Sequence, residues 1–592
     1  MSDTPSRFAA IITELRRRRV FRVAAVYACV AFIIIQIIDG AFDYLRIPEW
    51  VGATIILLLV LGFFIAVGMA WAFDLTAEGL VRTREIKRDQ PKKPPRPVIG
   101  NKALAVIALL AVIAAAWSWW GRPGKEAEVV VETGLGERSI AVLPFINMSA
   151  DPEQEYFCDG MAEEIINALT HVENLRVIAR TSTFAFKGEK IDIRKIGEQL
   201  NVESILEGSV RTAGNRVRIS AQLINVADFS HLWSERYDRD MKDIFAIQDE
   251  ISLAIVEALK VKLLKTEKAA IVKRHTEDLE AYNLYLKGNY YWQMLRFDKA
   301  IECYEQALQK DPHYALAYTG LASVYWWSSF FGNIPPNDAY PRAKEYAKKA
   351  LEIDDTLAEA HASLGVINMN YDWNFKAAER EFKQALHLNP NSALTHFQYS
   401  FLLTLTEFHE EAISEAKRAQ ELDPLSSWIN ALVGKALFFS GRYDEAIEVL
   451  RITITMNPNY FYSHFVLGLA YRGKSMFEEA IAEFEKSVHL SGENSWIMAE
   501  LAAAYYEFGK KSETEKIFDS LKQRSRDEYV APMCFYWIHK VRGDHDQAFE
   551  WVKRACEEHD SFLPWLRVSP IEIARIPDEP RFQALLEQAG LE

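Results

Sequence analysis

One stretch of the sequence matches the expression for a phosphate-binding loop. Residues 468–475, GLAYRGKS, carry glycine, lysine and serine at the spacing GxxxxGK[ST]. In nucleotide-binding proteins this loop joins a strand to a helix, so that its backbone N–H groups surround the phosphates. Here Gly468 and Tyr471 belong to a repeated helical pattern, and Gly473 ends that helix. We therefore predict no nucleotide site at these residues.

Acidic side chains open another predicted helix. Asp159, Glu163 and Glu164 lie in its first half, where the helix dipole favours carboxylates. The histidines of this region are isolated in the sequence, so capping is favoured over acid–base catalysis. The motifs HExxH, CxxC and GxSxG do not occur. The sequence therefore predicts no catalytic residue, no metal ligand and no cofactor, and a protein that is not an enzyme.

Five cysteines in 592 residues exclude a scaffold built on disulfides. Cys534 and Cys556 lie on successive predicted helices, on opposite sides of a turn near Gly543. If this part of the chain lies in an oxidising space, the two can form a disulfide. We state that disulfide as a hypothesis, with two reduced, buried cysteines as the alternative.

The charge of the chain is distributed unevenly. The formal net charge is −14, but the residues up to Arg122 include 16 basic and 9 acidic side chains, a net charge of +7. The remainder therefore carries −21. An acidic body argues against general nucleic-acid binding, because it would not neutralise phosphates.

The basic N-terminal region contains three apolar runs, and we predict a membrane anchor over residues 1–122. The spans are expected at about 20–39, 51–73 and 102–120, near the length that a bilayer requires. Arginines and lysines precede the first span and fill the loop before the third. Because cationic loops stay in the cytoplasm, the N-terminus is expected inside and the later domains outside.

A small α/β domain is predicted over 139–265, after a linker at 123–138. Short apolar runs such as 139–145 alternate with helical spacing, and alternating strands flank Ala213-Gly214-Asn215 as in a hairpin. The sequence IAVLPFINMSADPEQEYFCDGMAEEIINAL and the segments that follow resemble the TolB amino-terminal-like domain of bacterial envelope and signalling proteins. The resemblance implies a non-enzymatic module for partner contacts, beside tetratricopeptide repeats in a bacterial inner-membrane protein.

A 34-residue period fills the region 277–592 and is similar to the tetratricopeptide repeat (TPR). The first copy has Leu284, Gly288, Tyr304 and Pro312 at pattern positions of that family. Seven to eight repeats and a C-terminal cap are expected, folded into an all-α superhelix. His361, His396 and His464 fall at one repeat position, which favours packing between helices over metal binding.

The resemblance to TPR proteins implies a concave face built from the first helix of each repeat. Aromatic residues dominate its expected positions and form the candidate partner-binding groove: Tyr282, Tyr285, Trp292, Trp326, Phe397, Trp428, Phe438, Phe465, Trp496 and Tyr506. Such rings can grip an extended peptide or stack on sugars. The alternative is that many of them pack between neighbouring helices.

The expected protein is a membrane-anchored, non-enzymatic adaptor with periplasmic TolB-like and TPR domains. Its predicted partner is a protein or peptide in the cell envelope, with no nucleic acid. Two alternatives stay open: a glycan-binding repeat protein in polysaccharide export or wall maintenance, and a non-catalytic signalling subunit related to TPR-containing cyclase or regulator proteins.

Overall fold

The computed structural model describes residues 138–592, apart from 190, 333, 572–578 and 592, and a few residues nearer the N-terminus. The chain forms two compact units, Met1–Thr133 and Gly134–Glu592. In the first unit, β1 (Phe73–Thr76) pairs antiparallel with β2 (Gly79–Arg82). The linker predicted at 123–138 falls almost entirely outside the described residues.

The prediction of a three-span anchor is corrected by the structure. The runs at about 20–39, 51–73 and 102–120 lie almost entirely outside the described residues, and among those described no helix is long and apolar enough to cross a bilayer. The multi-pass inner-membrane location and the periplasmic body, which depended on those spans, are not supported. The prediction relied on the length of the apolar runs and on their cationic and aromatic flanks, and the first and third runs are near the lower limit of length, where buried segments are also typical.

The α/β domain contains a six-stranded mixed sheet. Its strands are β3 (Arg138–Val142), β4 (Ile146–Asn147), β5 (Leu175–Val177), β6 (Ser204–Ala213), β7 (Arg216–Asn225) and β8 (His231–Asp240). The order is β5-β3-β6-β7-β8, with β4 paired to β6. The strands β3 and β6 are parallel, whereas β6, β7 and β8 run antiparallel through tight connections. Gly214, at a φ of +59°, makes the β6–β7 turn.

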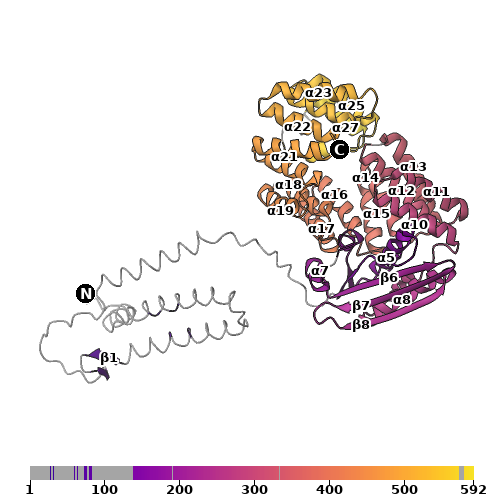
Figure 1. Cartoon of the computed structure of the whole chain (residues 1–592). Helices are drawn as coiled ribbons and strands as arrows, with labels where there is room; N and C mark the ends of the chain where they lie inside the picture. The colour runs from indigo at the N-terminus through magenta and orange to yellow at the C-terminus, as the bar shows by residue number, and fades with distance from the viewer. Residues whose placement is uncertain are drawn as a thin grey trace, which may run out of the picture. The chain divides into compact units, whose positions relative to one another are not determined.

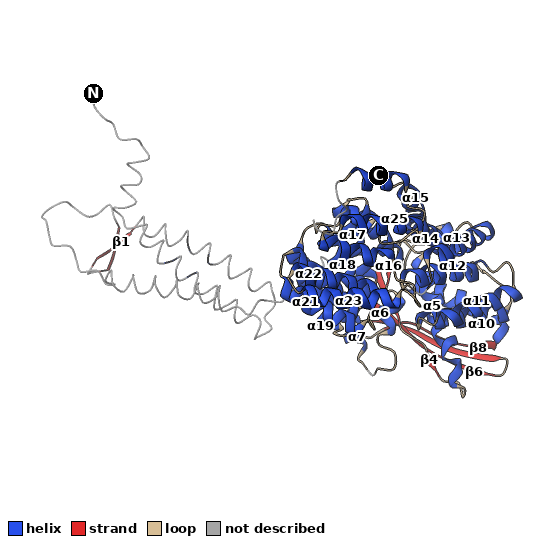
Figure 2. Cartoon of the chain, turned by 90° about the horizontal axis from the view of Figure 1, so that it is seen from above, coloured by secondary structure: helices blue, strands red, loops and turns tan. Residues whose placement is uncertain are grey.

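Helices cover both faces of this sheet. The domain contains α5 (Glu155–Thr170), α6 (Arg180–Phe184), α7 (Ile193–Leu200), α8 (Ile244–Ala258) and α9 (Lys265–Ile271). Ile165 of α5 and Ile251 of α8 share one apolar core with Ile219 of the sheet. Ile196 of α7 belongs to a smaller core on the other face. Within the unit Gly134–Glu592, Figure 2 shows the strands of this sheet gathered at one side of an otherwise mostly helical body.

Eight helical hairpins follow the α/β domain and form the TPR array. Their helices are α10 (Leu279–Gln293), α11 (Phe297–Lys310), α12 (Ala315–Phe330), α13 (Pro336–Ile353), α14 (Ala358–Asn370), α15 (Phe375–Leu388), α16 (Ala393–Leu405), α17 (His409–Leu422), α18 (Ser427–Phe439), α19 (Tyr443–Met456), α20 (Phe461–Gly473), α21 (Phe477–Leu490), α22 (Ser495–Glu507), α23 (Lys511–Arg524), α24 (Pro532–Arg542) and α25 (His545–Glu557). Two short helices, α26 (Trp565–Val568) and α27 (Pro580–Gln588), end the described chain.

Glycines allow the two helices of a hairpin to approach closely. A Cβ atom at Gly365 would lie 2.6 Å from the ring of Phe382, and one at Gly468 would lie 2.7 Å from the ring of Phe484. Both rings are fully buried. The small residue on the first helix therefore makes room for the aromatic residue on the second, which explains why the two recur together in the sequence.

The α/β domain is joined to the middle of the array by hydrogen bonds. Asn391, in the turn before α16, donates through Nδ2 to the carbonyls of Thr170 and Val172 at 3.2 and 3.0 Å. Ser182 of α6 donates to the buried Asp423 after α17 at 2.5 Å. The ends of α15 and α17 thus hold α5 and α6 against the repeats (Figure 1).

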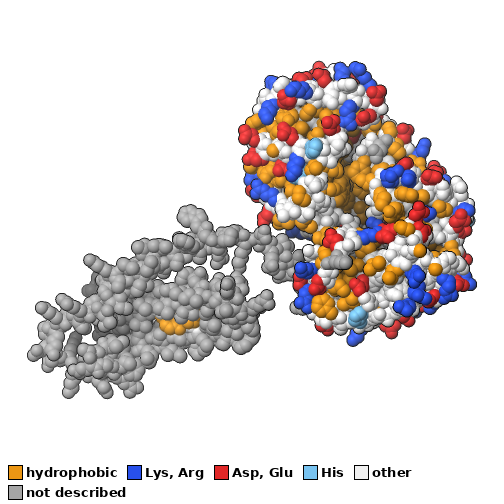
Figure 3. All heavy atoms as spheres, viewed as in Figure 1, with side chains coloured by type: hydrophobic (Ala, Val, Ile, Leu, Met, Phe, Trp, Pro, Cys, Tyr) orange, Lys and Arg blue, Asp and Glu red, His pale blue; other side chains and the backbone are white. Residues whose placement is uncertain are grey.

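The C-terminal segment returns to the earlier repeats. His559 stacks on Tyr371 with ring centroids 4.4 Å apart and donates from Nδ1 to the Tyr371 carbonyl. Trp565 of α26 meets Phe401 of α16 and Phe439 of α18, at 5.4 and 5.0 Å between centroids. The array therefore curves enough for its end to contact its middle. Figure 3 shows apolar side chains gathered in the hollow between the earlier and later repeats.

Candidate functional site

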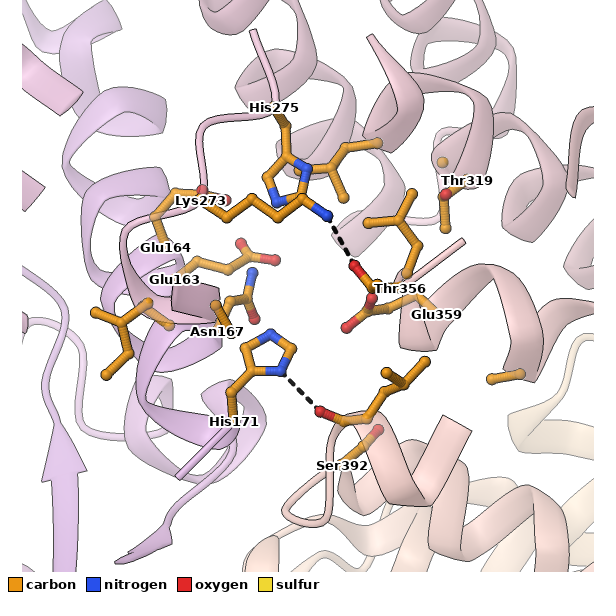
Figure 4. Close-up of a pocket in the computed structure, with 18 of the residues that line it drawn as sticks. Glu163, Glu164, Asn167, His171, Lys273, His275, Thr319, Thr356, Glu359 and Ser392 are labelled. Carbon is orange, nitrogen blue, oxygen red and sulfur yellow. Dashed lines mark hydrogen bonds between the residues drawn. The ribbon is translucent and has the colours of Figure 1, made fainter. Parts of the chain in front are cut away.

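A cavity of 1120 Å³ lies between the α/β domain and the first repeats. Helices α5, α8 and α9 contribute one wall, and α10, α12, α14 and α16 contribute the other. Ligand pockets for small molecules usually measure about 300–1,000 Å³. The cavity is therefore large enough for more than a single small molecule. Figure 4 shows part of its lining.

Four of the ten aromatic residues predicted for the groove line this cavity: Tyr282, Tyr285, Trp292 and Trp326. Tyr282, on α10, is buried and accepts a hydrogen bond from Gln248 Nε2 of α8 at 2.6 Å. Tyr285 packs against Tyr314 with ring centroids 5.2 Å apart. The rings are thus held in place by both domains, and they give the cavity rigid apolar walls.

Several polar atoms in the wall have no partner within the described part of the chain. The indole nitrogens of Trp292 and Trp326 are unpaired donors, and Oε1 of Gln398 and Oε1 of Glu164 are unpaired acceptors. Trp326 is only 4% exposed and Gln398 only 3%. A buried polar group without a partner costs about 1–3 kcal/mol.

The α5 wall of the cavity is acidic. Burial, followed by the nearby charges of Glu163 and Glu359, raises the pKa of Glu164 to about 8. Burial also raises the pKa of Glu163, although the Arg180 guanidinium, 3.1 Å away, acts in the opposite direction. Figure 4 shows Glu163 and Glu164 on one side of the opening and Glu359 of α14 on the other. The cavity therefore places carboxyl groups on two facing walls.

Basic side chains at the cavity have acidic neighbours. Lys273 Nζ lies 2.5 Å from Asp354, and His275 lies 3.5 Å from the same carboxylate. Burial lowers the pKa of His275, which favours its neutral form. His171 Nδ1 donates to the carbonyl of Leu388 at 2.9 Å, so this ring also joins the two walls.

The other predicted groove residues lie further along the array and contact one another. Trp428 stacks on Tyr462 at 4.6 Å and lies 5.6 Å from Phe397, and Phe465 meets Trp496 edge-on at 4.5 Å. These contacts are the packing between helices that the sequence offered as the alternative.

The remaining two groove residues also have intramolecular contacts. Phe438 packs against Tyr443 at 5.8 Å, and Tyr506 lies under the ammonium of Lys511 at 5.0 Å. The structure therefore brings four of the ten aromatics into a cavity, while the binding of a partner by any of them stays a prediction.

The three histidines at one repeat position have structural partners. His361, His396 and His464 each hydrogen-bond through Nδ1 to a glutamate of the following helix, at 2.7, 2.5 and 2.6 Å. Each Nε2 reaches a backbone carbonyl near the preceding turn. These bonds tie the two helices of each hairpin, and the described residues contain no group of three potential metal ligands.

The stretch that matches the phosphate-loop expression lies within a helical hairpin. Residues 468–473 belong to α20, and Gly468 faces Phe484 of the next helix. Arg472, 4% exposed, pairs with Glu500 and with Glu507 of α22. The backbone N–H groups of a helix are bonded internally, so they are not free to surround phosphates.

The cysteines considered for a disulfide lie on neighbouring helices. Cys534 is buried on α24, and Cys556 is half-buried on α25. Both are free in this structure. Burial raises the pKa of the Cys556 thiol to about 11, which keeps it protonated at neutral pH.

Sequence reasoning missed the role of α5. It treated Glu163 and Glu164 as helix-start carboxylates, whereas the structure pairs the first with Arg180 and places the second in the cavity wall. A signal was present: Glu164, Asn167 and His171 follow helical spacing and so share a face. The opposing wall comes from residues 80 or more positions later, which local spacing does not reveal.

Comparisons with protein families match two parts of the chain. Residues 136–254 match the second domain of HilA/YgeH-like transcriptional regulators, and 281–314 and 434–495 match the tetratricopeptide repeat. The TPR prediction is confirmed. The prediction of a TolB-like domain is corrected: the α/β domain matches the HilA/YgeH-like model, and no TolB-like domain is shown. Its strand and helix order alone did not distinguish the two families.

Curated proteins match over part of their length. The chain is 42% identical over 236 residues to the putative adenylate cyclase 3 of Rhizobium meliloti, which covers 38% of this chain and 40% of that protein. It is 22% identical over 292 residues to the transcriptional regulator HilA of Salmonella typhimurium, covering 48% and 51%. The chain thus covers about half, or less, of the length of these relatives. A solved structure of Pseudomonas aeruginosa PilF is 20% identical, with a TM-score of 0.26, over 40% of this chain and 98% of that one.

Proposed function

We propose that this TPR protein is a non-enzymatic adaptor that holds an extended peptide segment of a protein partner in the cavity between α5 and the first repeats. The observation that carries the proposal is the cavity of 1120 Å³ against the first repeats, with Tyr282, Tyr285, Trp292 and Trp326 in its wall.

The shape and lining of the cavity also support a peptide. Tyr282 and Tyr285 are only 2% and 8% exposed and Trp292 is half-buried, so these rings line the cavity with small apolar surfaces that are already fixed in position. Rigid aromatic rings lose little conformational entropy on binding and are typical anchors in protein interfaces. The excess of acidic over basic side chains in the wall also argues against nucleic acid as the occupant.

Site-directed crosslinking would test the proposal in cells. A photoreactive amino acid placed at Ser323, which lines the cavity, should capture a defined protein through one short segment. The same reactive residue at Ser512, exposed on α23, is the matched control. A synthetic peptide of the captured segment should bind the purified full-length chain. Identical products from both positions, or a peptide without affinity, would contradict the adaptor.

A regulatory role is a second candidate. The α/β domain and the repeats match relatives named a transcriptional regulator and a putative adenylate cyclase over part of their length. On this proposal the adaptor delivers its partner to a signalling or regulatory step. Changes in transcript levels after deletion of the chain, restored by the wild type but not by a Trp326→Phe variant, would support it. Unchanged transcripts would count against it. Comparisons do not support the glycan-binding alternative.

A further inference from the structure

We propose that β8 (His231–Asp240) is an interface through which two copies of this chain pair edge to edge, in an antiparallel register centred on Tyr237. The inference goes beyond the proposed function, because it concerns the edge of the sheet and not the cavity, so either can fail alone. Three observations lead to it: the free edge of β8, the order of charges along that strand, and an arginine of the strand that has no counter-ion among the residues described.

The strand β8 lies at one end of the sheet. In the order β5-β3-β6-β7-β8 it is paired with β7 alone among the described strands. It is 10 residues long, and Figure 1 shows it as the outermost of the three long strands. One side of its backbone therefore lacks a partner strand. Such an edge presents N–H and C=O groups that a strand of another chain can pair with.

The side chains of β8 alternate between the two faces of the sheet. Tyr237 is buried in the apolar core that includes Ile251 of α8, whereas Arg236 and Asp238 are exposed on the opposite face. Side chains directly opposite each other in an antiparallel pair lie on the same face. Two identical strands that pair about a two-fold axis must therefore be centred on a residue and not between two residues.

The charges along β8 are self-complementary about Tyr237. In the register centred there, Arg236 lies opposite Asp238 of the second copy, and Glu235 lies opposite Arg239 of the second copy. By symmetry each pairing occurs twice, and in all of these pairs a charge faces its opposite. Opposite charges across a strand pair stabilise it, whereas like charges directly opposite destabilise it.

The neighbouring registers oppose like charges. A pairing centred on Arg236 sets two arginines against each other, and one centred on Asp238 sets two aspartates against each other. Centring on Glu235 or on Arg239 has the same defect. Charged side chains on an edge strand usually prevent pairing with other chains, and here they disfavour these registers. The same charges favour the register on Tyr237, so they select a second copy of this chain as the partner.

The face that carries Arg236 has room for this pairing. Arg236 is exposed and makes no ion pair with any residue that the structure describes. Asp238 is already bonded to two arginines of β7. The carboxylate of Asp240 has longer ion pairs, at 3.8 Å to Arg216 and 3.9 Å to Lys242. Arg236 of a second copy would lie opposite the first aspartate and diagonal to the second, within reach of a long side chain.

The pair on the other face adds less. Arg239 is held by Glu250 of α8 at 2.7 Å, and Glu235 accepts a hydrogen bond from the Tyr237 hydroxyl at 3.1 Å. Both side chains therefore have partners within their own chain. The preference for the register depends mainly on Arg236, which makes this residue the one to change.

Sedimentation equilibrium of the full-length chain would test this inference. The wild type should form a dimer whose dissociation constant rises with salt concentration. Arg236→Asp sets aspartates opposite Asp238 at two symmetric places and should weaken the dimer at least about tenfold. Arg211→Asp makes the same change of charge at an exposed position of β6, away from the edge, and should leave the dimer unchanged.

A complementary variant separates pairing from a general effect of charge. Asp238→Arg alone should also weaken the dimer, because two arginines then face each other. An equal mixture of Arg236→Asp chains and Asp238→Arg chains should dimerise about as tightly as the wild type, since every charge in the mixed pair faces its opposite. Thermal unfolding checks that each variant is folded. A wild type that stays monomeric, a dimer unaffected by Arg236→Asp, or a mixture no tighter than the separate variants would overturn the inference.

Cysteine crosslinking reports the register. Ser234 lies opposite Asp240 of the second copy when the pairing is centred on Tyr237. A mixture of Ser234→Cys and Asp240→Cys chains should therefore form a disulfide between these two positions, identified by mass spectrometry. Ser234→Cys chains alone should not crosslink at this position, because its two copies lie about 20 Å apart along the strands. A dimer that crosslinks in the unmixed sample and not in the mixture would contradict the register.

Discussion

Glu164 shows how strongly its surroundings change the chemistry of a carboxyl group. It lies in the second half of α5 (Glu155–Thr170), and burial and two neighbouring carboxyls raise its pKa to about 8. Its surroundings include residues of several elements: Glu163 and Asn167 of α5, Tyr282 and Tyr285 of α10, Tyr314 before α12, and Glu359 of α14. None of these side chains is a cation.

This raised pKa predicts that the stability of the fold depends on pH. Glu164 keeps its proton in the folded chain up to about pH 8, whereas its usual pKa is 4.5. The free energy of unfolding should therefore fall as pH increases from 5 to 8, by up to about 1.4 kcal/mol per unit. Urea unfolding at several pH values measures this effect. Glu164→Gln should show a weaker pH dependence; an identical profile would contradict the assignment.

Two substitutions of Trp326 separate the contribution of its ring from the contribution of its indole N–H group. Trp326→Phe keeps an aromatic ring and removes an unpaired buried donor, so the free energy of unfolding should change by less than about 1 kcal/mol. Trp326→Ala should cost about 3–5 kcal/mol, because it opens a cavity. Urea unfolding measures both variants, and a large loss of stability in Trp326→Phe would contradict this separation of the ring from its N–H group.

At the scale of elements, the sequence predicted the helical hairpins, but it did not predict which of their turns contact the α/β domain. The recurrence of a glycine on one helix and an aromatic residue on the next, as in Gly468 and Phe484, predicted a close helix pair, and the structure has that contact. Nothing in the local pattern indicated that Asn391, in an inter-repeat turn, would hold the end of α5. Such hydrogen bonds depend on which inter-repeat turn packs against the α/β domain in the folded chain.

The helix pair predicts a stability effect at Gly468. Gly468→Ala places a Cβ 2.7 Å from the Phe484 ring, inside van der Waals contact, and should destabilise the chain by about 1–3 kcal/mol through overpacking. Ser512→Ala, exposed on α23, is the control and should have little effect. Urea unfolding followed by circular dichroism measures both. A neutral Gly468→Ala would mean that the two helices separate readily.

At the scale of the molecule, the C-terminal segment returns to the concave side of the array. Trp565 contacts Phe401 and Phe439, and the ammonium of Lys435 lies 3.9 Å from its ring centroid. Figure 1 shows the C-terminal end lying near the earlier repeats. The segment therefore links repeats that are distant in sequence, and its Phe562 lies 5.8 Å from Trp496, one of the predicted groove residues.

This link predicts that Trp565→Ala loosens distant elements. Loss of the ring contacts should cost about 1–3 kcal/mol and increase hydrogen exchange in the segment around Trp565 and in α16 and α18. Trp551→Ala removes a ring that stacks on Phe535 within the last hairpin at 4.3 Å, so its effect should stay in α24 and α25. Exchange mass spectrometry compares the two variants; equal patterns would show that the return of the segment does not stabilise the middle repeats.

The sequence by itself determined the repeats and the order of strands and helices, because periodicity and glycine–aromatic pairs are local properties of a chain. It also identified Tyr282, Tyr285, Trp292 and Trp326 as residues of one helix face in successive repeats. The tertiary structure decided that the opposing wall is α5, that Glu164 is left without a cation, and that later aromatics pack together. These outcomes depend on contacts between residues far apart in sequence. The length of apolar runs and helical spacing do not predict such contacts.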